Sequence, residues 1–80
     1  MVTYYFDFRT GDVLSQDEEG ASLPDIEAAH RVALQAIADA IQGVVLQDLP
    51  SRRFQVEVRD DLGRVLEISA VLNSKILRKQ

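Results

Sequence analysis

The 24 residues from Pro24 to Gln47 read PDIEAAHRVALQAIADAIQGVVLQ. Apolar side chains recur in this segment at three- and four-residue spacing, and most charged and amide side chains fall on the opposite side of a helical wheel. Pro24 suits the first turn of a helix, where its missing N–H would have no partner. Pro50 disfavours helical geometry in the residue before it, so the helix must end earlier. The pattern predicts one long amphipathic helix over residues 24–47.

A strand and a turn precede this helix. Residues 2–9 alternate, with aromatic and β-branched side chains on one face and mostly polar side chains on the other. The segment Thr10-Gly11-Asp12 supplies turn chemistry, because Gly accepts a positive φ and Asp bonds locally. Val13 and Leu14 begin a short return strand. The N-terminal residues are therefore predicted to form a β-hairpin.

A second hairpin is predicted after the helix. Residues 54–59 alternate between apolar and polar side chains, and a returning strand follows over residues 66–72. Between them, Asp60-Asp61-Leu62-Gly63 fits a type I turn closed by a glycine bulge. The strand order stays open: the strands over 2–9 and 54–59 can lie side by side in parallel, or the whole sheet can be antiparallel.

The order β-β-α-β-β predicts an α+β two-layer sandwich, in which one helix covers one face of a four-stranded sheet. Eighty residues suffice for one small domain, which we place over residues 1–73. Residues 74–80 form a basic C-terminal tail, and from Ile76 to Gln80 it is either frayed or folded as a short helical turn.

Composition excludes several classes of protein. The chain has no cysteine, which rules out disulfides, a thiolate nucleophile, zinc fingers and iron–sulfur clusters. Uninterrupted apolar runs do not exceed three residues, so no membrane span is expected. The N-terminus has no basic region followed by an apolar stretch, so we expect no signal peptide and a cytoplasmic location.

Several short elements then occur in a fixed order: an aromatic–acidic start, a turn glycine, an acidic loop, a proline-containing helix entry and a charged strand. They are Tyr4-Tyr5-Phe6-Asp7, Gly11, Asp17-Glu18-Glu19-Gly20, Leu23-Pro24-Asp25, Glu27-Ala28-Ala29, Val56-Glu57-Val58-Arg59-Asp60 and Gly63. With these elements the chain resembles a family of short uncharacterised bacterial proteins, common in rhizobia and other alphaproteobacteria and classed as a domain of unknown function. The resemblance covers residues 3–70 and implies an α+β fold, but it brings no activity, cofactor or catalytic residue.

The densest acidic stretch is a candidate cation site, because carboxylates bind hard cations. Its members are Asp12, Asp17, Glu18, Glu19 and Asp25. An EF-hand loop needs oxygen ligands at its first, third and fifth positions and a glycine at its sixth. Counted from Asp12 the third residue is Leu14, and counted from Asp17 the fourth is already Gly20. The spacing fails, so we predict no metal ligand and interpret the stretch as a solvated loop near the helix N-terminus.

His30 is the sole histidine and falls inside the apolar stripe of the predicted helix. A lone histidine there is more typical of a hydrogen-bonded boundary residue than of a general base. The sequence has no serine at a nucleophile spacing, no glycine-rich phosphate loop and no metal-spaced histidine pair. We therefore predict a non-enzymatic protein with no catalytic residue, no cofactor and no small-molecule substrate.

The polar faces of two predicted strands are the candidate interaction surface, because the helix cannot cover them. Their side chains are Tyr5, Asp7, Arg9, Gln55, Glu57 and Arg59. Opposite charges on neighbouring strands can pair across the sheet. This face is either simply solvated or meets a protein partner or second copy, with Tyr5, Val65 and Val71 as apolar contacts. A homodimer is one expected form, because an 80-residue domain gains stability from such burial.

Charge divides unevenly along the chain. Residues 1–50 hold nine acids and two bases, which gives −7, and residues 51–80 hold four acids and seven bases, which gives +3. The favoured function is a protein-interaction module acting through the open sheet face. The alternative is a small nucleic-acid-associated or antitoxin-like regulator that uses Arg52, Arg53 and the basic tail. It is weaker because the aromatic residues, which would stack on bases, are concentrated in the acidic half.

Overall fold

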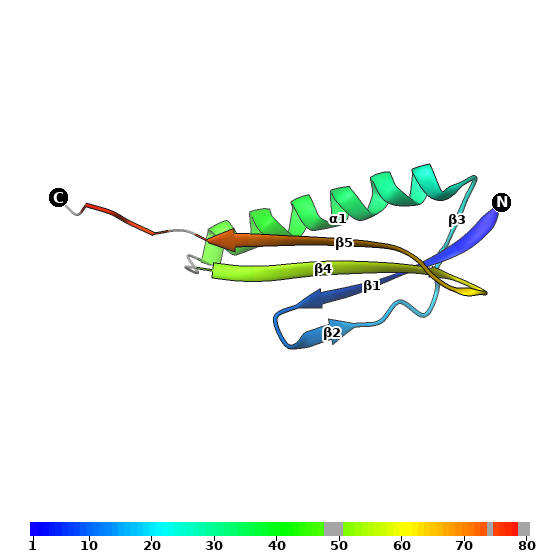
Figure 1. Cartoon of the computed structure of the whole chain (residues 1–80), viewed down its shortest axis with the longest axis horizontal. Coiled ribbons are helices and arrows are strands. Elements are labelled where there is room, and N and C mark those ends of the chain that lie inside the picture. Colours follow the sequence, from blue (N-terminus) through cyan, green and yellow to red (C-terminus); the bar gives the residue numbers. More distant parts are fainter. Residues whose placement is uncertain (48–50, 74, 79–80) are drawn as a thin grey trace.

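The structure, a computed structural model, describes residues 1–47, 51–73 and 75–78. It is an α+β fold in which one helix lies on one face of an antiparallel sheet, as the sequence predicts (Figure 1). The elements, in chain order, are β1 (Val2–Thr10), β2 (Val13–Ser15), β3 (Ala21–Leu23), α1 (Ile26–Gln47), β4 (Ser51–Asp60) and β5 (Gly63–Asn73). No helix within the described ranges is long and apolar enough to cross a membrane.

The sheet has the strand order β2-β1-β4-β5, and every pairing is antiparallel. The two hairpins therefore join through β1 and β4, which pair over six residues of β1, from Tyr5 opposite Arg59 to Thr10 opposite Phe54. This register decides the alternative that the sequence left open, in favour of the wholly antiparallel sheet.

A fifth strand distinguishes the structure from the predicted four-stranded sheet. β3 pairs with the first part of β1, and β2 pairs with its last part, so both short strands lie along the same edge of β1. Alternation does not reveal β3, because a three-residue strand is too short to show a period of two. The predicted β-β-α-β-β order thus becomes β-β-β-α-β-β.

Both hairpin turns fall where the sequence places them. Gly11 has a φ of +59° between β1 and β2, and Gly63 has a φ of +125° where β5 begins. The Asp60 carboxylate accepts a hydrogen bond from the Leu62 N–H at 2.8 Å, which fixes the second turn locally. The register of this hairpin shifts between Val58 and Arg59.

The helix begins two residues later than predicted. The Asp25 side chain accepts a hydrogen bond from the Ala28 N–H at 2.9 Å, and the Asp25 carbonyl accepts one from the Ala29 N–H at 3.3 Å. These are the bonds of an N-cap residue, so Asp25 caps the helix and Pro24 lies before it. The helix is described as far as Gln47, and residues 48–50, where its predicted end would be tested, lie outside the described residues.

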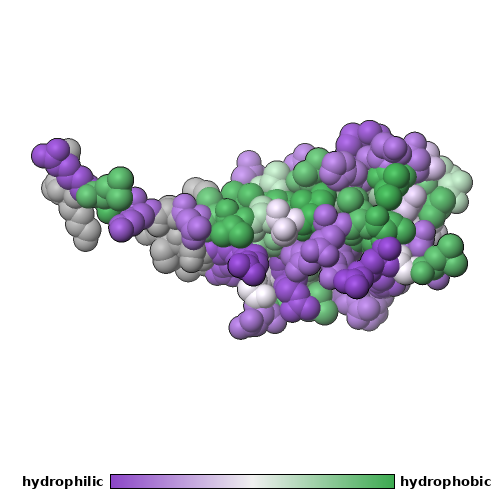
Figure 2. Space-filling model, in the orientation of Figure 1, coloured by the Kyte–Doolittle hydropathy of each residue, from purple (hydrophilic) through white to green (hydrophobic). Residues whose placement is uncertain are grey.

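Residues 75–78, the described part of the C-terminal tail, project away from the domain (Figure 1). β5 ends at Asn73, and residues 75–78 form neither helix nor strand, which excludes a helical turn there. The predicted tail spans residues 74–80, of which 74, 79 and 80 lie outside the described residues. Figure 2 shows hydrophobic as well as hydrophilic side chains on this protruding segment, in the same orientation as Figure 1.

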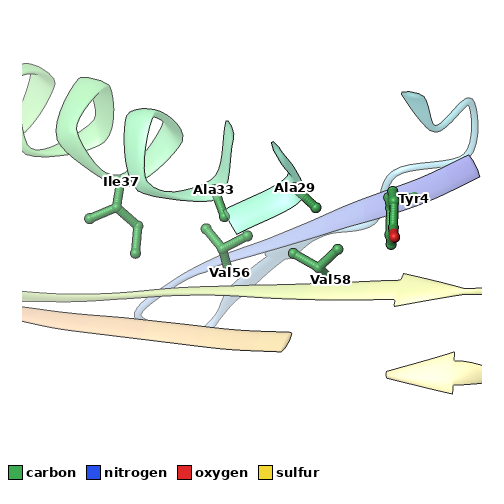
Figure 3. Close-up of a cluster of buried hydrophobic side chains, with 6 residues drawn as sticks. All are labelled: Tyr4, Ala29, Ala33, Ile37, Val56 and Val58. Atoms are coloured by element: carbon green, nitrogen blue, oxygen red, sulfur yellow. The ribbon is translucent and has the colours of Figure 1, made fainter. Parts of the chain in front are cut away.

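The core lies between α1 and the middle of the sheet. Ala29 and Ala33 are fully buried and point from the helix toward Val56 and Val58 on β4 (Figure 3). Because alanine is small, the helix backbone can approach the sheet closely at these two turns, and Ile37 fills the space beyond them. No helix among the described residues covers the opposite face of β1 and β4, which bears the six predicted side chains.

Candidate interaction surface

All six candidate side chains lie on the sheet face opposite the helix. β1 and β4 place them in three directly opposed pairs: Tyr5 with Arg59, Asp7 with Glu57, and Arg9 with Gln55. Their neighbours along both strands, such as Phe6 and Val56, pack into the core or against it, and successive strand residues point to opposite faces. The face defined by these six residues is called the open face below.

At one end of the open face, Arg59 is held by three partners. Its Nε donates to Asp7 Oδ2 at 2.9 Å, and its Nη2 donates to the Asp17 carbonyl at 2.8 Å. The guanidinium carbon lies 4.6 Å from the centre of the Tyr5 ring. The hydrogen bond to Asp7 raises the pKa of Arg59 above its ordinary value. The expected pairing of opposite charges across the sheet is present here, on the diagonal between Asp7 and Arg59.

Asp17 ties the loop between β2 and β3 to the sheet. Its Oδ2 accepts a hydrogen bond from the Phe6 N–H at 3.1 Å, and its Oδ1 accepts from the Glu19 and Gly20 N–H groups at 3.1 and 3.2 Å. The Asp17 N–H in turn donates to Asp7 Oδ1 at 3.0 Å. The hydrogen bond from Phe6, followed by that from Gly20, lowers the pKa of Asp17 below its ordinary value of 3.8.

Asp17 thereby satisfies a backbone group that the sheet leaves free. β3 pairs with residues 2–4 of β1, and β2 pairs with residues 8–10. No described strand therefore lies beside the middle of this β1 edge, at residues 5–7. At Phe6 the Asp17 carboxylate accepts the backbone N–H hydrogen bond that a neighbouring strand would otherwise accept. The interpretation of the acidic stretch as a solvated loop is therefore wrong for Asp17, while Glu18 and Glu19 are exposed as expected.

Gly20 completes this loop because no larger residue fits. Its φ is +75°, and a Cβ added there would lie 2.8 Å from Thr3 Cγ2 and 2.9 Å from Tyr5 Cε1. Glycine is favoured here both by the positive φ and by the close approach of this backbone to β1. Within the described ranges, no group of three His, Cys, Asp or Glu residues is arranged to hold a metal ion.

The other end of the open face is less constrained. Arg9 is exposed and forms no ion pair with any residue that the structure describes. A small hollow of about 120 Å³ lies beside it. Its lining comprises Asp7, Arg9, Leu14, Gln16, Gln55 and Glu57. Small-molecule sites usually enclose about 300–1,000 Å³, so this hollow is better suited to one side chain of a partner.

Two predicted side chains have different surroundings from those expected. Val65 packs against the core instead of lying on the open face, because the register shift between Val58 and Arg59 turns it toward the helix side. His30 was expected at a hydrogen-bonded boundary, but it is exposed and has no side-chain hydrogen bond within the described residues. Val71 is 59% exposed, as an apolar contact on this face requires.

The fold and surface define a class: a small α+β domain with one helix-covered sheet face and one polar face held in place by an arginine–carboxylate network. A family model described as a domain of unknown function (DUF6894) matches residues 3–71. The chain therefore belongs to this family. No curated protein and no solved structure matches the chain.

Proposed function

We propose that this protein is a non-enzymatic interaction module that binds a protein partner through its open face. The observation that carries the proposal is the division of this face into two parts. Arg59, Asp7 and Asp17 bond to one another at one end, while Arg9 is free to bond with a partner at the other. A surface that is already ordered loses little conformational entropy on binding.

The chemistry of the free end indicates what it would bind. Exposed Arg9 and Gln16 offer hydrogen-bond donors, half-buried Gln55 and Glu57 offer acceptors, and Leu14 is 52% exposed. Mixed polar contacts around a small apolar centre are typical of protein interfaces. The carboxylates of Asp7 and Asp17 are engaged with Arg59 and backbone amides, which argues against their use as acid–base catalysts.

A photo-crosslinking residue tests the proposal when placed at Gln55 of the full chain, in cells that naturally contain this protein. The matched control carries the same residue at Leu62, which is 97% exposed in the β4–β5 turn. We expect a crosslinked partner at Gln55 but not at Leu62. The purified partner should then bind the Arg9→Glu variant about 10-fold or more weakly than the wild type, as an interface contact predicts. Equal crosslinking at both positions, or unchanged affinity of Arg9→Glu, would refute the proposal.

The alternative, a nucleic-acid-associated regulator, is supported by exposed cations at Arg53, Lys75 and Arg78. It ranks second because Arg52 and Arg53 are successive residues of β4 and so belong to opposite faces of the sheet. The Tyr5 ring, which would stack on a base, already lies under Arg59. A salt titration against mixed DNA and RNA separates the two functions. Micromolar binding that weakens steeply with salt would favour the regulator.

A further inference from the structure

A second surface lies on the helix side of the sheet, beside the part of β1 that α1 covers incompletely: Tyr4 is buried in the core, whereas Phe6 and Phe8 are half-buried. α1 packs on β4, β5 and β3, and Figure 1 shows it running beside β5 and β4, away from β2. Beside β1 there is a shallow groove of about 470 Å³. Its floor contains the half-buried rings of Phe6 and Phe8, and its wall is the β2–β3 loop with Asp17, Glu18 and Glu19.

The wall of this groove carries uncompensated negative charge. Asp17 is occupied by three backbone N–H groups, but Glu18 and Glu19 are exposed and form no ion pair with any described residue. Two aromatic rings next to two free carboxylates suit a ligand that carries both apolar and cationic side chains.

The chain's own C-terminal tail has this chemistry. Lys75-Ile76-Leu77-Arg78 places two apolar side chains between two cations, and Ile76 and Leu77 are 77% and 86% exposed. Exposed isoleucine and leucine side chains gain free energy when an apolar surface covers them. Figure 2 shows hydrophobic side chains on this tail, away from the body of the domain.

The tail cannot reach the groove of its own chain. Asn73 lies opposite Ser51, whereas Phe8 and Phe6 lie opposite Val56 and Val58. At a rise of about 3.3 Å per residue and a strand spacing of about 4.8 Å, the groove floor is about 20–25 Å from Asn73. A fully extended chain carries the Ile76 backbone about 10 Å and the Leu77 backbone about 14 Å from Asn73. The occupant must therefore come from another molecule.

We infer that Lys75–Arg78 of one copy docks into the Phe6–Phe8 groove of a second copy. Ile76 and Leu77 contact the aromatic floor, while Lys75 and Arg78 pair with Glu18 and Glu19. Because the two contact surfaces differ, the interface is heterologous: copies assemble either as an open chain or as a pair that exchanges tails. This contact uses the face opposite the open face, so it stands independently of the proposed function.

Mass measurement by light scattering on the full chain tests the inference. At ~500 µM protein and ~50 mM salt, where charge pairs are weakly screened, we expect the average mass to exceed the 9.0 kDa of one chain. The double variant Ile76→Asp/Leu77→Asp should remain at 9.0 kDa. Leu62→Asp is the matched control, because it also replaces an exposed apolar residue but lies in the β4–β5 turn, and it should associate like the wild type.

A charge exchange makes the test specific for the groove. One protein carries Glu18→Lys/Glu19→Lys and the other carries Lys75→Glu/Arg78→Glu. In either variant alone, the tail and the groove carry charges of the same sign, so each should remain at 9.0 kDa. In a mixture, the acidic tail of one variant meets the basic groove of the other, so the two proteins should associate. A 9.0 kDa wild type, association of Ile76→Asp/Leu77→Asp, or a mixture that stays monomeric would overturn the inference. Far-UV circular dichroism establishes that each variant is folded.

A peptide locates the contact without relying on oligomer mass. The probe is a synthetic peptide of residues 73–80, NSKILRKQ, added to the ¹⁵N-labelled full-length Ile76→Asp/Leu77→Asp variant. We expect amide shifts at Phe6, Phe8 and residues 15–19, and none at Ser69 of β5. Shifts confined to β5, or no shifts at all, would contradict docking in this groove.

Discussion

Replacing Asp17 by Ala is expected to destabilise the protein far more than its position in an acidic surface loop suggests. The substitution removes the acceptor of three backbone N–H groups, those of Phe6, Glu19 and Gly20. The Phe6 N–H is partly buried and has no strand beside it, so its loss carries most of the cost. Hydrogen bonds to a charged group contribute about 1.5–3 kcal/mol each, and less where water replaces the acceptor.

We therefore expect Asp17→Ala to lose about 2–3 kcal/mol of unfolding free energy, which is large against the roughly 4–12 kcal/mol typical of a chain of this size. Asp17→Asn should lose about 1–2 kcal/mol, because its NH₂ group would face the Phe6 N–H while its oxygen serves the other amides. The matched control is Glu18→Ala, since Glu18 is exposed and next in sequence. Urea unfolding at neutral pH measures all three.

The same carboxylate predicts how the difference depends on pH. Its pKa is lowered in the folded protein from the ordinary value of 3.8, so its contribution is present above this pH and is lost as the pH falls through the folded-state pKa. The gap between wild type and Asp17→Ala should thus be full at about pH 6 and shrink below about pH 4. A difference in unfolding free energy of less than about 0.5 kcal/mol between Asp17→Ala and Glu18→Ala, or a gap that persists in acid, would refute this role of Asp17.

Three further substitutions have calculable effects on thermal unfolding, where 1 kcal/mol shifts the Tm by about 4–8 °C. Gly20→Ala should lower the free energy of unfolding by about 2–4 kcal/mol, because φ is +75° at this position and the added Cβ would lie within 3 Å of Thr3 and Tyr5. At Gly11 φ is also positive, but the added Cβ would meet open space, so Gly11→Ala should lower it by about 1 kcal/mol. Asp25→Ala removes the helix cap and should lose about 1 kcal/mol. Ala33→Leu overfills a fully buried position and should lose about 1–3 kcal/mol, whereas Ala38→Leu is exposed and should change little. A Tm for Gly20→Ala equal to that of Gly11→Ala, or for Ala33→Leu equal to that of Ala38→Leu, would contradict the assigned contacts.

The long elements of this fold follow from periodicity because each spans several repeats of its pattern. The helix has about six turns, and β1 and β4 each alternate over about four pairs of residues. Their alternation assigns the two faces of β1 and β4 correctly, and the helical period places Ala29, Ala33 and Ile37 in the core, but His30, which falls in the same predicted stripe, is exposed. The same alternation places Tyr5, Asp7, Arg9, Gln55, Glu57 and Arg59 on one face. The structure adds that β1 and β4 are antiparallel neighbours, which opposes these side chains in pairs.

Features that depend on tertiary contacts were missed. β3 exists because β1 has a free edge beside it, and Asp17 finds the Phe6 N–H because β2 and β3 leave a gap between them. The local signal for Asp17 was its position three residues before Gly20, a spacing typical of Asp side chains that bond to a turn. Val65 was misassigned because a register shift reverses the alternation of β5, and no residue pattern at Val65 marks it.

The β2–β3 loop connects the two surfaces that we assign to binding. On one side the Asp17 carbonyl receives Arg59 from the open face, and on the other the loop presents Glu18 and Glu19 beside Phe6 and Phe8. Asp17 holds both arrangements, because its carboxylate fixes the loop to β1 and its N–H reaches Asp7. A change at Asp17 should therefore weaken both contacts, whereas Arg9→Glu should affect the open face alone and Glu18→Lys the groove alone. The two surfaces can thus be altered separately at Arg9 and at Glu18, but both depend on the position of the β2–β3 loop. This acidic segment therefore supports both surfaces, although its spacing does not fit a metal site.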